Sequence, residues 1–167
     1  MVLDNIFFQV ANLEDVEALE AIRLKAFKPI FESFRNILGD AIYETAQMPE
    51  DIAQQDLLRS YFEEESVWIT WKVIFQSQII GFIAIRLDEQ SGVGEIGLNA
   101  IDPSFSGKGI GTKMYKFAIG EMKHSGMKVA TAATGGDPAH LPAREAYRKA
   151  GFTVRIPTVW MCQELGE

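Results

Sequence analysis

The sequence predicts a single-domain α/β protein in which one mixed sheet is flanked by a few helices. Three observations lead to this fold class. The chain has 167 residues, the length of one compact domain, so residues 1–167 are expected to form it. Its middle contains three closely spaced β-rich segments. Two segments with helical periodicity follow them, and each is closed by a glycine.

The N-terminal part is expected to contain one strand and two helices. Ile6–Val10 has the apolar composition of a strand. Asn12 is a suitable N-cap for a first helix, which we expect to end at Lys28 because Pro29 interrupts the pattern. A second helix is expected over about Pro49–Glu65, with the proline near its start.

The three β-rich segments are Ser66–Phe75, Ile79–Leu87 and Val93–Ile101. They are rich in β-branched and aromatic residues, which favour strands. Their connections are short, and short connections join antiparallel neighbours. We therefore expect an antiparallel meander in the middle of the chain.

The C-terminal part is expected to alternate helices and strands. Gly109–Ser125 carries an apolar stripe at helical spacing and is followed by Gly126, a typical C′ residue. A short strand is expected over Lys128–Thr134 and a second helix over about His140–Ala150. Phe152–Cys162 is expected to return to the sheet as one or two strands.

Composition excludes several classes of protein. No run of about 18 apolar residues is present, which argues against a membrane span, and the N-terminus lacks the pattern of a signal peptide. The single Cys162 forms no intrachain disulfide and the chain has two histidines, so we expect a reducing cytoplasm and no metal cluster. A net charge of −7 argues against nucleic-acid binding and favours a neutral or cationic substrate.

Two glycine patterns compete as candidate phosphate sites. Gly92–Gly97 (GVGEIG) matches the dinucleotide-binding fingerprint, but a strand rather than a helix follows it, so we interpret it as a turn. Ser106–Thr112 (SGKGIGT) lies between a strand end and a helix start. Unpaired N–H groups at a helix start, freed of side chains, suit an anion such as a pyrophosphate. A glycine-rich structural turn is the alternative.

The second pattern resembles a known motif. Ser106–Gly111, following a strand, is similar to motif A of the GNAT N-acetyltransferase superfamily, with Ser106 in place of the usual Gln or Arg. His140–Phe152 resembles motif B, with His140 in place of the usual Asn. The resemblance covers about Val93–Phe152. Motif B is matched at Ala143, Tyr147, Lys149, Gly151 and Phe152.

The resemblance implies a fold and a co-substrate. The sheet would be twisted, largely antiparallel and splayed between its fourth and fifth strands, and acetyl-CoA would lie in that splay. The pyrophosphate would sit on the amides of Gly107–Thr112, and the pantetheine arm would run beside Leu98–Ile101. The residues expected to contact coenzyme A are Asn99, Ala100, Ile101, Ser106, Gly107, Lys108, Gly109, Ile110, Gly111, Thr112, His140 and Ala143.

The resemblance also suggests a general acid. The tyrosine of motif B, here Tyr147, would protonate the departing thiolate. The alternative is that Tyr147 packs in the core, because Ala143, Ala146 and Ala150 form an apolar helical stripe with it.

Glu95 is the candidate base, since some family members carry a glutamate at this position of the strand. Simple strand alternation predicts that Glu95 and Asn99 face one cleft. The alternative for Glu95 is an exposed carboxylate without a catalytic role. A backbone N–H near Asn99 or Ala100, at a bulge of the kind the family has, would stabilise the oxyanion.

The expected function is acetyl-CoA-dependent N-acetyl transfer to a small-molecule or peptide amine, direct and within a ternary complex. Two alternatives stay open: a coenzyme A binding or sensing module without catalysis, motivated by the departures at Ser106 and His140, and a nucleotide-phosphate binder that uses the same loop. A homodimer is possible, because dimers are common in the superfamily.

Overall fold

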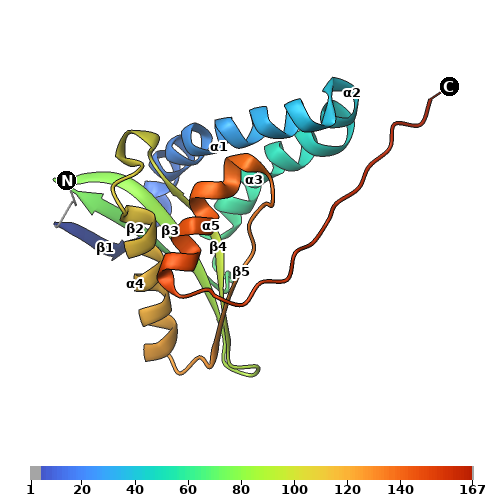
Figure 1. Ribbon diagram of the computed structural model, residues 1–167. Helices are drawn as coiled ribbons and strands as arrows, with labels where there is room; N and C mark the ends of the chain where they lie inside the picture. Colours follow the sequence, from blue (N-terminus) through green and yellow to red (C-terminus); the bar gives the residue numbers. More distant parts are fainter. Residues whose placement is uncertain (1–4, 167) are drawn as a thin grey trace.

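The computed structural model describes residues 5–166 and shows one five-stranded sheet with helices on both faces (Figure 1). The strands lie in the order β1-β2-β3-β4-β5. Neighbours are antiparallel from β1 to β4, and β5 is parallel to β4, so the expected mixed, largely antiparallel sheet is confirmed. The bounds are Ile6–Val10 (β1), Trp68–Phe75 (β2), Gln78–Asp88 (β3), Val93–Ile101 (β4) and Val129–Ala132 (β5).

The helices form two layers around this sheet. One apolar core joins the sheet to α4 and α5, and a second joins its other face to α1 and α3. Asn12 caps the N-terminal turn as predicted, because its side chain accepts from Glu14 N–H. The helix bounds are Val16–Leu38 (α1), Asp40–Ile42 (α2), Met48–Ser60 (α3), Ile110–His124 (α4) and Leu141–Ala150 (α5), with a π-helical turn over Tyr43–Gln47.

The predicted end of the first helix at Lys28 is wrong, because α1 continues through Pro29 to Leu38. A proline inside a helix costs about 3 kcal/mol through its missing N–H and its ring clash. The C-terminal half of α1 is anchored by tertiary contacts that oppose this cost, among them the hydrogen bond from Ser33 Oγ to Asp137. The second helix also ends earlier than expected, at Ser60 rather than Glu65.

The C-terminal segment also differs from expectation. Phe152–Cys162 was expected to form one or two strands, but no strand is present between Gly151 and Gly166. Every residue of 153–166 is exposed, and from the end of α5 the segment runs past the sheet and then away from the folded body to the C-terminus (Figure 1). A β-prone sequence becomes a strand only when a neighbouring strand completes its hydrogen bonds, and none lies beside this segment in the part of the chain described.

A β-bulge interrupts β4 and changes which side chains share a face. Ile83 pairs with Asn99 and Ile85 with Ile96, so β4 has one more residue than β3 between these pairs. Gly97 consequently faces Trp68 and Tyr61, on the α1/α3 side, whereas Asn99 faces the tyrosines of α4 and α5. Simple alternation had predicted one shared face for Glu95 and Asn99, and that prediction is wrong.

Close packing of β3 against β4 makes Gly81 intolerant of a side chain. A Cβ at Gly81 would lie 2.7 Å from the carbonyl oxygen of Ala100, which is backbone and cannot move aside cheaply. We expect Gly81→Ala to lower the free energy of unfolding by about 1–3 kcal/mol. Gly120→Ala in α4, where a Cβ meets nothing within 4 Å, should instead raise it by about 0.5–1 kcal/mol. Urea denaturation measures both, and equal effects would contradict the packing argument.

Candidate active site

A cleft opens where β4 and β5 part. The two strands pair only between Val93–Ile96 and Val129–Ala132. Beyond Ile96, β4 continues to Ile101 paired with β3 but without β5 beside it. The splay expected between the fourth and fifth strands is therefore present. The cleft has a volume of about 540 Å³ and is bounded by the end of β4, the glycine loop with the start of α4, the first turns of α5, and the Ala26–Ile30 stretch of α1.

The glycine loop forms one wall of this cleft. Gly109 precedes the first residue of α4 and has a left-handed backbone with φ of 76°, and Gly107 has φ of 74°. A Cβ built on either residue would meet nothing within 4 Å. The loop therefore turns sharply into the helix while keeping open space against its backbone, and the free N–H groups of the first turn of α4 can donate to an anion.

Cations lie near this loop despite the negative net charge of the chain. The Lys108 ammonium donates to the carbonyl oxygen of Ser104 at 3.1 Å and lies 4.9 Å from the centre of the Phe105 ring. Lys149 of α5 lines the opposite wall of the cleft. Local potential rather than net charge acts on a bound anion, so this arrangement favours a phosphate-bearing ligand.

Asp102 holds the start of the loop in place. Its side chain accepts hydrogen bonds from Ser104 Oγ at 2.7 Å and from Ser104 N–H at 3.0 Å. These bonds, with the smaller contribution of the Lys25 ammonium 3.3 Å away, hold the pKa of Asp102 below its ordinary value. The carboxylate stays ionised and ties the loop to α1, which closes one side of the cleft.

Two stacked tyrosines and an asparagine meet at the inner end of the cleft. The rings of Tyr115 and Tyr147 lie 3.9 Å apart and are nearly parallel, at 6°. Tyr115 donates to Asn99 Oδ1 at 2.9 Å, and Asn99 Nδ2 donates to the Tyr147 oxygen at 3.2 Å. Because the Tyr147 oxygen accepts from Asn99, its own proton remains for another acceptor.

Burial raises the pKa of Tyr147, and hydrogen bonds with Tyr115 and Asn99 lower it by less. Burial likewise raises the pKa of Tyr115 well above its ordinary value. Tyr147 is only 6% exposed, so it packs in the core and also carries a hydroxyl into a polar contact with a cleft residue. The packing and catalytic interpretations of this residue are therefore compatible.

Tyr115 is the site residue that the sequence analysis missed. It lies on α4 beside Met114 and is buried like Met114 and Ala118, so its residue type alone does not distinguish it from the core of that helix. The available signal was its spacing of four residues from Gly111, which places it on the helix face that continues from the glycine loop toward the core.

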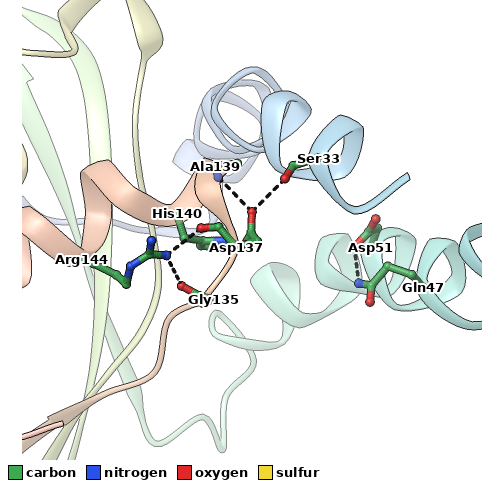
Figure 2. A network of polar contacts seen from close by, with 8 residues as sticks. All are labelled: Ser33, Gln47, Asp51, Gly135, Asp137, Ala139, His140 and Arg144. Atoms are coloured by element: carbon green, nitrogen blue, oxygen red, sulfur yellow. Dashed lines mark hydrogen bonds and ion pairs between the residues drawn. The ribbon is translucent and has the colours of Figure 1, made fainter. Parts of the chain in front are cut away.

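A polar network joins the entrance of α5 to α1 (Figure 2). The Asp137 carboxylate pairs with His140 Nδ1, accepts from Ser33 Oγ at 3.0 Å and accepts from Ala139 N–H at 3.0 Å. Arg144 Nη1 donates to the carbonyl oxygens of Gly135 and Asp137 at 2.6 and 2.7 Å. The network fixes the loop after β5 against α1, so His140 is held by a carboxylate rather than turned freely into the cleft.

Asp137 should stabilise the fold in a pH-dependent way. Burial raises its pKa, but the hydrogen bond and charge of His140, with bonds from Ser33 and Ala139, outweigh burial and lower the pKa below the ordinary value of an aspartate. A lowered carboxyl pKa contributes stability above its ordinary value, and that contribution is lost as the pH falls through the folded-state pKa. We therefore expect Asp137→Asn to cost about 1–3 kcal/mol at neutral pH and less as the pH falls below about 4.

Urea titrations between pH 7 and pH 3 measure this difference. Asp40→Asn is the matched control, because Asp40 pairs with Arg35 but its side chain is 78% exposed. That substitution should change stability by about 0.5 kcal/mol or less. A cost of Asp137→Asn that does not decline toward pH 3 would contradict the assigned titration.

The predicted site residues separate into three groups. Glu95 precedes the bulge and lies on the α1/α3 face of the sheet, where its carboxylate pairs with Arg86. The Arg86 guanidinium in turn lies over the Trp68 ring. Lys108, His140 and Tyr147 are neighbours of lining residues and do not line the cleft themselves. The cleft is lined by Asn99, Ala100, Ile101, Ser106, Gly107, Gly109, Ile110, Gly111, Thr112 and Ala143.

Several solved structures with this architecture are described as acetyltransferases. The PaiA N-acetyltransferase of Thermoplasma acidophilum, in complex with coenzyme A, has a TM-score of 0.68 at 20% identity, covering 90% of this chain and 91% of its own. The putative acetyltransferase YycN of Bacillus subtilis has a TM-score of 0.67 at 18% identity, covering 98% and 100%. The aminoglycoside acetyltransferase AAC(6')-Iy, with a bisubstrate analogue, has a TM-score of 0.61 at 11% identity, covering 97% and 100%.

Structural similarity at such low sequence identity shows the fold alone. The family is shown by a match of the sequence to a family profile. The profile of the acetyltransferase (GNAT) family matches residues 31–152, and this chain belongs to that family. No curated protein matches the chain. Within residues 5–166, no helix is long and apolar enough to cross a membrane, and no group of three or more metal-ligating side chains is present.

Proposed function

We propose that the protein is an acetyl-CoA-dependent N-acetyltransferase that transfers an acetyl group directly to an amine bound in the same complex. One observation carries the proposal: the open glycine loop at the start of α4 lines the same cleft as Asn99, whose side-chain amide donates to the buried Tyr147 hydroxyl. The coenzyme A and acetyl-CoA found in solved relatives of this fold support the same co-substrate here.

The residues of the cleft fit this co-substrate. The amides of Gly107–Thr112 would hold the pyrophosphate, since the space beside Gly107 and Gly109 is open. The backbone of Asn99–Ile101, which none of the strands within residues 5–166 pairs on the cleft side, would hydrogen-bond the amide groups of the pantetheine arm. Ser106 offers a shorter side chain than the Gln or Arg usual there, so in our proposal the backbone provides most of the phosphate binding.

The chemistry requires three proton or charge movements, and the chain offers a group for each. The Tyr147 hydroxyl would give its proton to the departing sulfur, and its raised pKa keeps that proton in place at neutral pH. A backbone N–H at the bulge next to Asn99 would donate to the oxyanion. Glu95 would accept the proton of the amine, directly or through water, from the α1/α3 side of the sheet.

Binding of the co-substrate is tested by thermal shift of the purified protein with acetyl-CoA, coenzyme A or ATP. A ligand that binds only the folded state raises the midpoint of unfolding. We expect acetyl-CoA and coenzyme A to raise it and ATP at the same concentration to leave it unchanged. Equal stabilisation by ATP would favour a nucleotide-phosphate binder, and no shift with any ligand would refute the cofactor site.

Turnover is tested by detecting the free thiol released from acetyl-CoA in the presence of amines. The panel should contain aminoglycosides, polyamines, amino acids and peptides, since two solved relatives are named aminoglycoside acetyltransferases. The second candidate function is a coenzyme A binding module. The pairing of His140 with Asp137 favours it, because a ring held by Asp137 would not make the cofactor contact that the residue at this position of motif B usually makes. Binding without thiol release for every amine would support that candidate.

A further inference from the structure

One peptide group in the bulge of β4 is held by side chains from both faces of the sheet. The carbonyl oxygen of Gly97 accepts from Asn99 Nδ2 at 2.9 Å, and the Asn99 side chain faces α4 and α5. The N–H of Leu98, in the same peptide group, donates to the Tyr61 oxygen at 3.5 Å, on the side of α1 and α3. Because a peptide group is planar and moves as one unit, these two contacts together fix its tilt.

Tyr61 is itself held firmly against the bulge. It comes directly after α3, is 5% exposed, and stacks on Trp68 with the ring centres 4.7 Å apart and the planes at 22°. A Cβ at Gly97 would lie 2.4 Å from Trp68 Cζ3 and 2.9 Å from the Tyr61 oxygen. The absence of a side chain at Gly97 therefore allows the hydroxyl to reach the backbone of the bulge.

The Tyr61 hydroxyl has one polar partner within residues 5–166, which is the Leu98 N–H. Burial raises the pKa of Tyr61, and the hydrogen bond from Leu98 lowers it by less, so the hydroxyl is protonated at neutral pH. Burying a hydroxyl costs free energy, and a phenylalanine here would keep the stacking on Trp68 without that cost. The contact with the bulge is thus the feature that distinguishes this tyrosine from a packing residue.

Asn99 connects the same peptide group to Tyr147. Its Nδ2 donates both to the Gly97 carbonyl oxygen and, at 3.2 Å, to the Tyr147 oxygen. A tilt of the Gly97–Leu98 peptide would move the carbonyl on which this amide rests, and the donor to Tyr147 would move with it. A misplacement of about 1 Å can slow a reaction about a hundredfold, so a fraction of that shift is enough to affect turnover.

We propose that Tyr61 is a positioning residue of the acetyl-transfer site, which fixes the Gly97–Leu98 peptide and, through Asn99, orients the Tyr147 hydroxyl on the opposite face of the sheet. The proposal rests on the proposed acetyl transfer with Tyr147 as its acid. It gives the end of α3 a part in a reaction whose acid lies on α5. The contact of 3.5 Å is long, so its loss should cost less than the loss of the acid itself.

Tyr61→Phe should lower kcat about five- to tenfold and leave the KM of acetyl-CoA within about twofold of wild type. The substitution frees the peptide group and keeps the ring on Trp68. Tyr43→Phe is the matched control, because Tyr43 is 7% exposed and its hydroxyl donates to Asp51, away from the bulge. An unchanged kcat in Tyr61→Phe, or an equal loss in Tyr43→Phe, would overturn the proposal.

A double-mutant cycle tests the path from Tyr61 to Tyr147. If Tyr61 acts through the Tyr147 hydroxyl, the double variant Tyr61→Phe/Tyr147→Phe should have the kcat of Tyr147→Phe alone. A merely structural effect of Tyr61 would instead multiply with the effect of Tyr147. Multiplied losses would therefore overturn the proposed path.

Nuclear magnetic resonance separates a failure of this inference from a failure of acetyl transfer. In protein labelled with nitrogen-15 asparagine, the side-chain amide signals of Asn99 are identified by their absence from Asn99→Asp. Tyr61→Phe should shift these signals from across the sheet, and Tyr43→Phe should not. Unshifted signals in Tyr61→Phe would overturn the proposal. No thiol release by wild type with any amine would refute acetyl transfer instead, and the signals would still decide whether Tyr61 orients Asn99.

Discussion

Tyr147→Phe should lower kcat for acetyl transfer by about 10²-fold while leaving the Kd of coenzyme A nearly unchanged. The substitution removes the hydroxyl that accepts from Asn99 and keeps the ring that stacks on Tyr115 and packs against Phe152. The proton for the departing sulfur would then have to come from water, which raises the barrier of the chemical step. Steady-state kinetics with thiol detection measures the rate, and thermal shift measures binding.

Two matched variants separate proton donation from loss of a buried hydroxyl. Tyr43→Phe removes the hydroxyl that donates to Asp51 at 2.9 Å, away from the cleft, and should change stability but not kcat. Tyr115→Phe frees Asn99 Oδ1 and should lower kcat by less than Tyr147→Phe, because Tyr115 acts through Asn99. Full turnover in Tyr147→Phe would refute the assigned acid without refuting acetyl transfer.

The pH dependence follows from the direction of the shift. Burial raises the pKa of Tyr147 above that of an ordinary tyrosine, so its proton is lost at higher pH than usual. The rate should therefore rise with pH as the amine becomes neutral and should show no decline due to Tyr147 up to about pH 10. A descending limb below pH 9 that disappears in Tyr147→Phe would contradict the raised pKa.

Gly109→Val should weaken coenzyme A binding by at least about tenfold, which corresponds to about 1.4 kcal/mol. A branched side chain would occupy the open space next to the loop and keep a phosphate from the amides at the start of α4. Gly109 also has φ of 76°, so part of any effect on stability comes from backbone strain. Isothermal titration with coenzyme A measures the affinity for this ligand separately from the stability of the fold.

Gly126→Val is the control for that strain. Gly126 follows α4 at its other end, has φ of 79°, and its Cβ position is equally open. Both variants should lose comparable stability, and only Gly109→Val should lose affinity. Equal losses of affinity would show that the loop acts through the general stability of α4 and not through contact with the phosphate.

Sequence patterns predicted the elements whose partners are near in the chain. The β2–β4 meander was predicted because its connections are short, and β4 was placed at its observed bounds, Val93–Ile101. The glycine loop was found because positive φ restricts residue type at Gly107 and Gly109. These are local requirements, so the local sequence carries them.

Other features depend on contacts that no local pattern encodes. The bulge in β4 is set by pairing with β3, and it invalidates the alternation from which one face was predicted for Glu95 and Asn99. The hydrogen bond between Ser33 and Asp137 joins residues 104 positions apart. The continuation of α1 past Pro29 depends on such contacts, and so does the absence of a strand in the tail.

The bulge has a consequence for insertions and deletions along the chain. Removing either Gly97 or Leu98 would restore even pairing between β3 and β4 without breaking the meander, so a chain one residue shorter would keep its sheet. Asn99 would stay opposite Ile83 and beside Tyr115 and Tyr147, because the residues on both sides of the bulge would keep their partners. Length variation at this point would thus leave both the architecture and the polar inner end of the cleft intact.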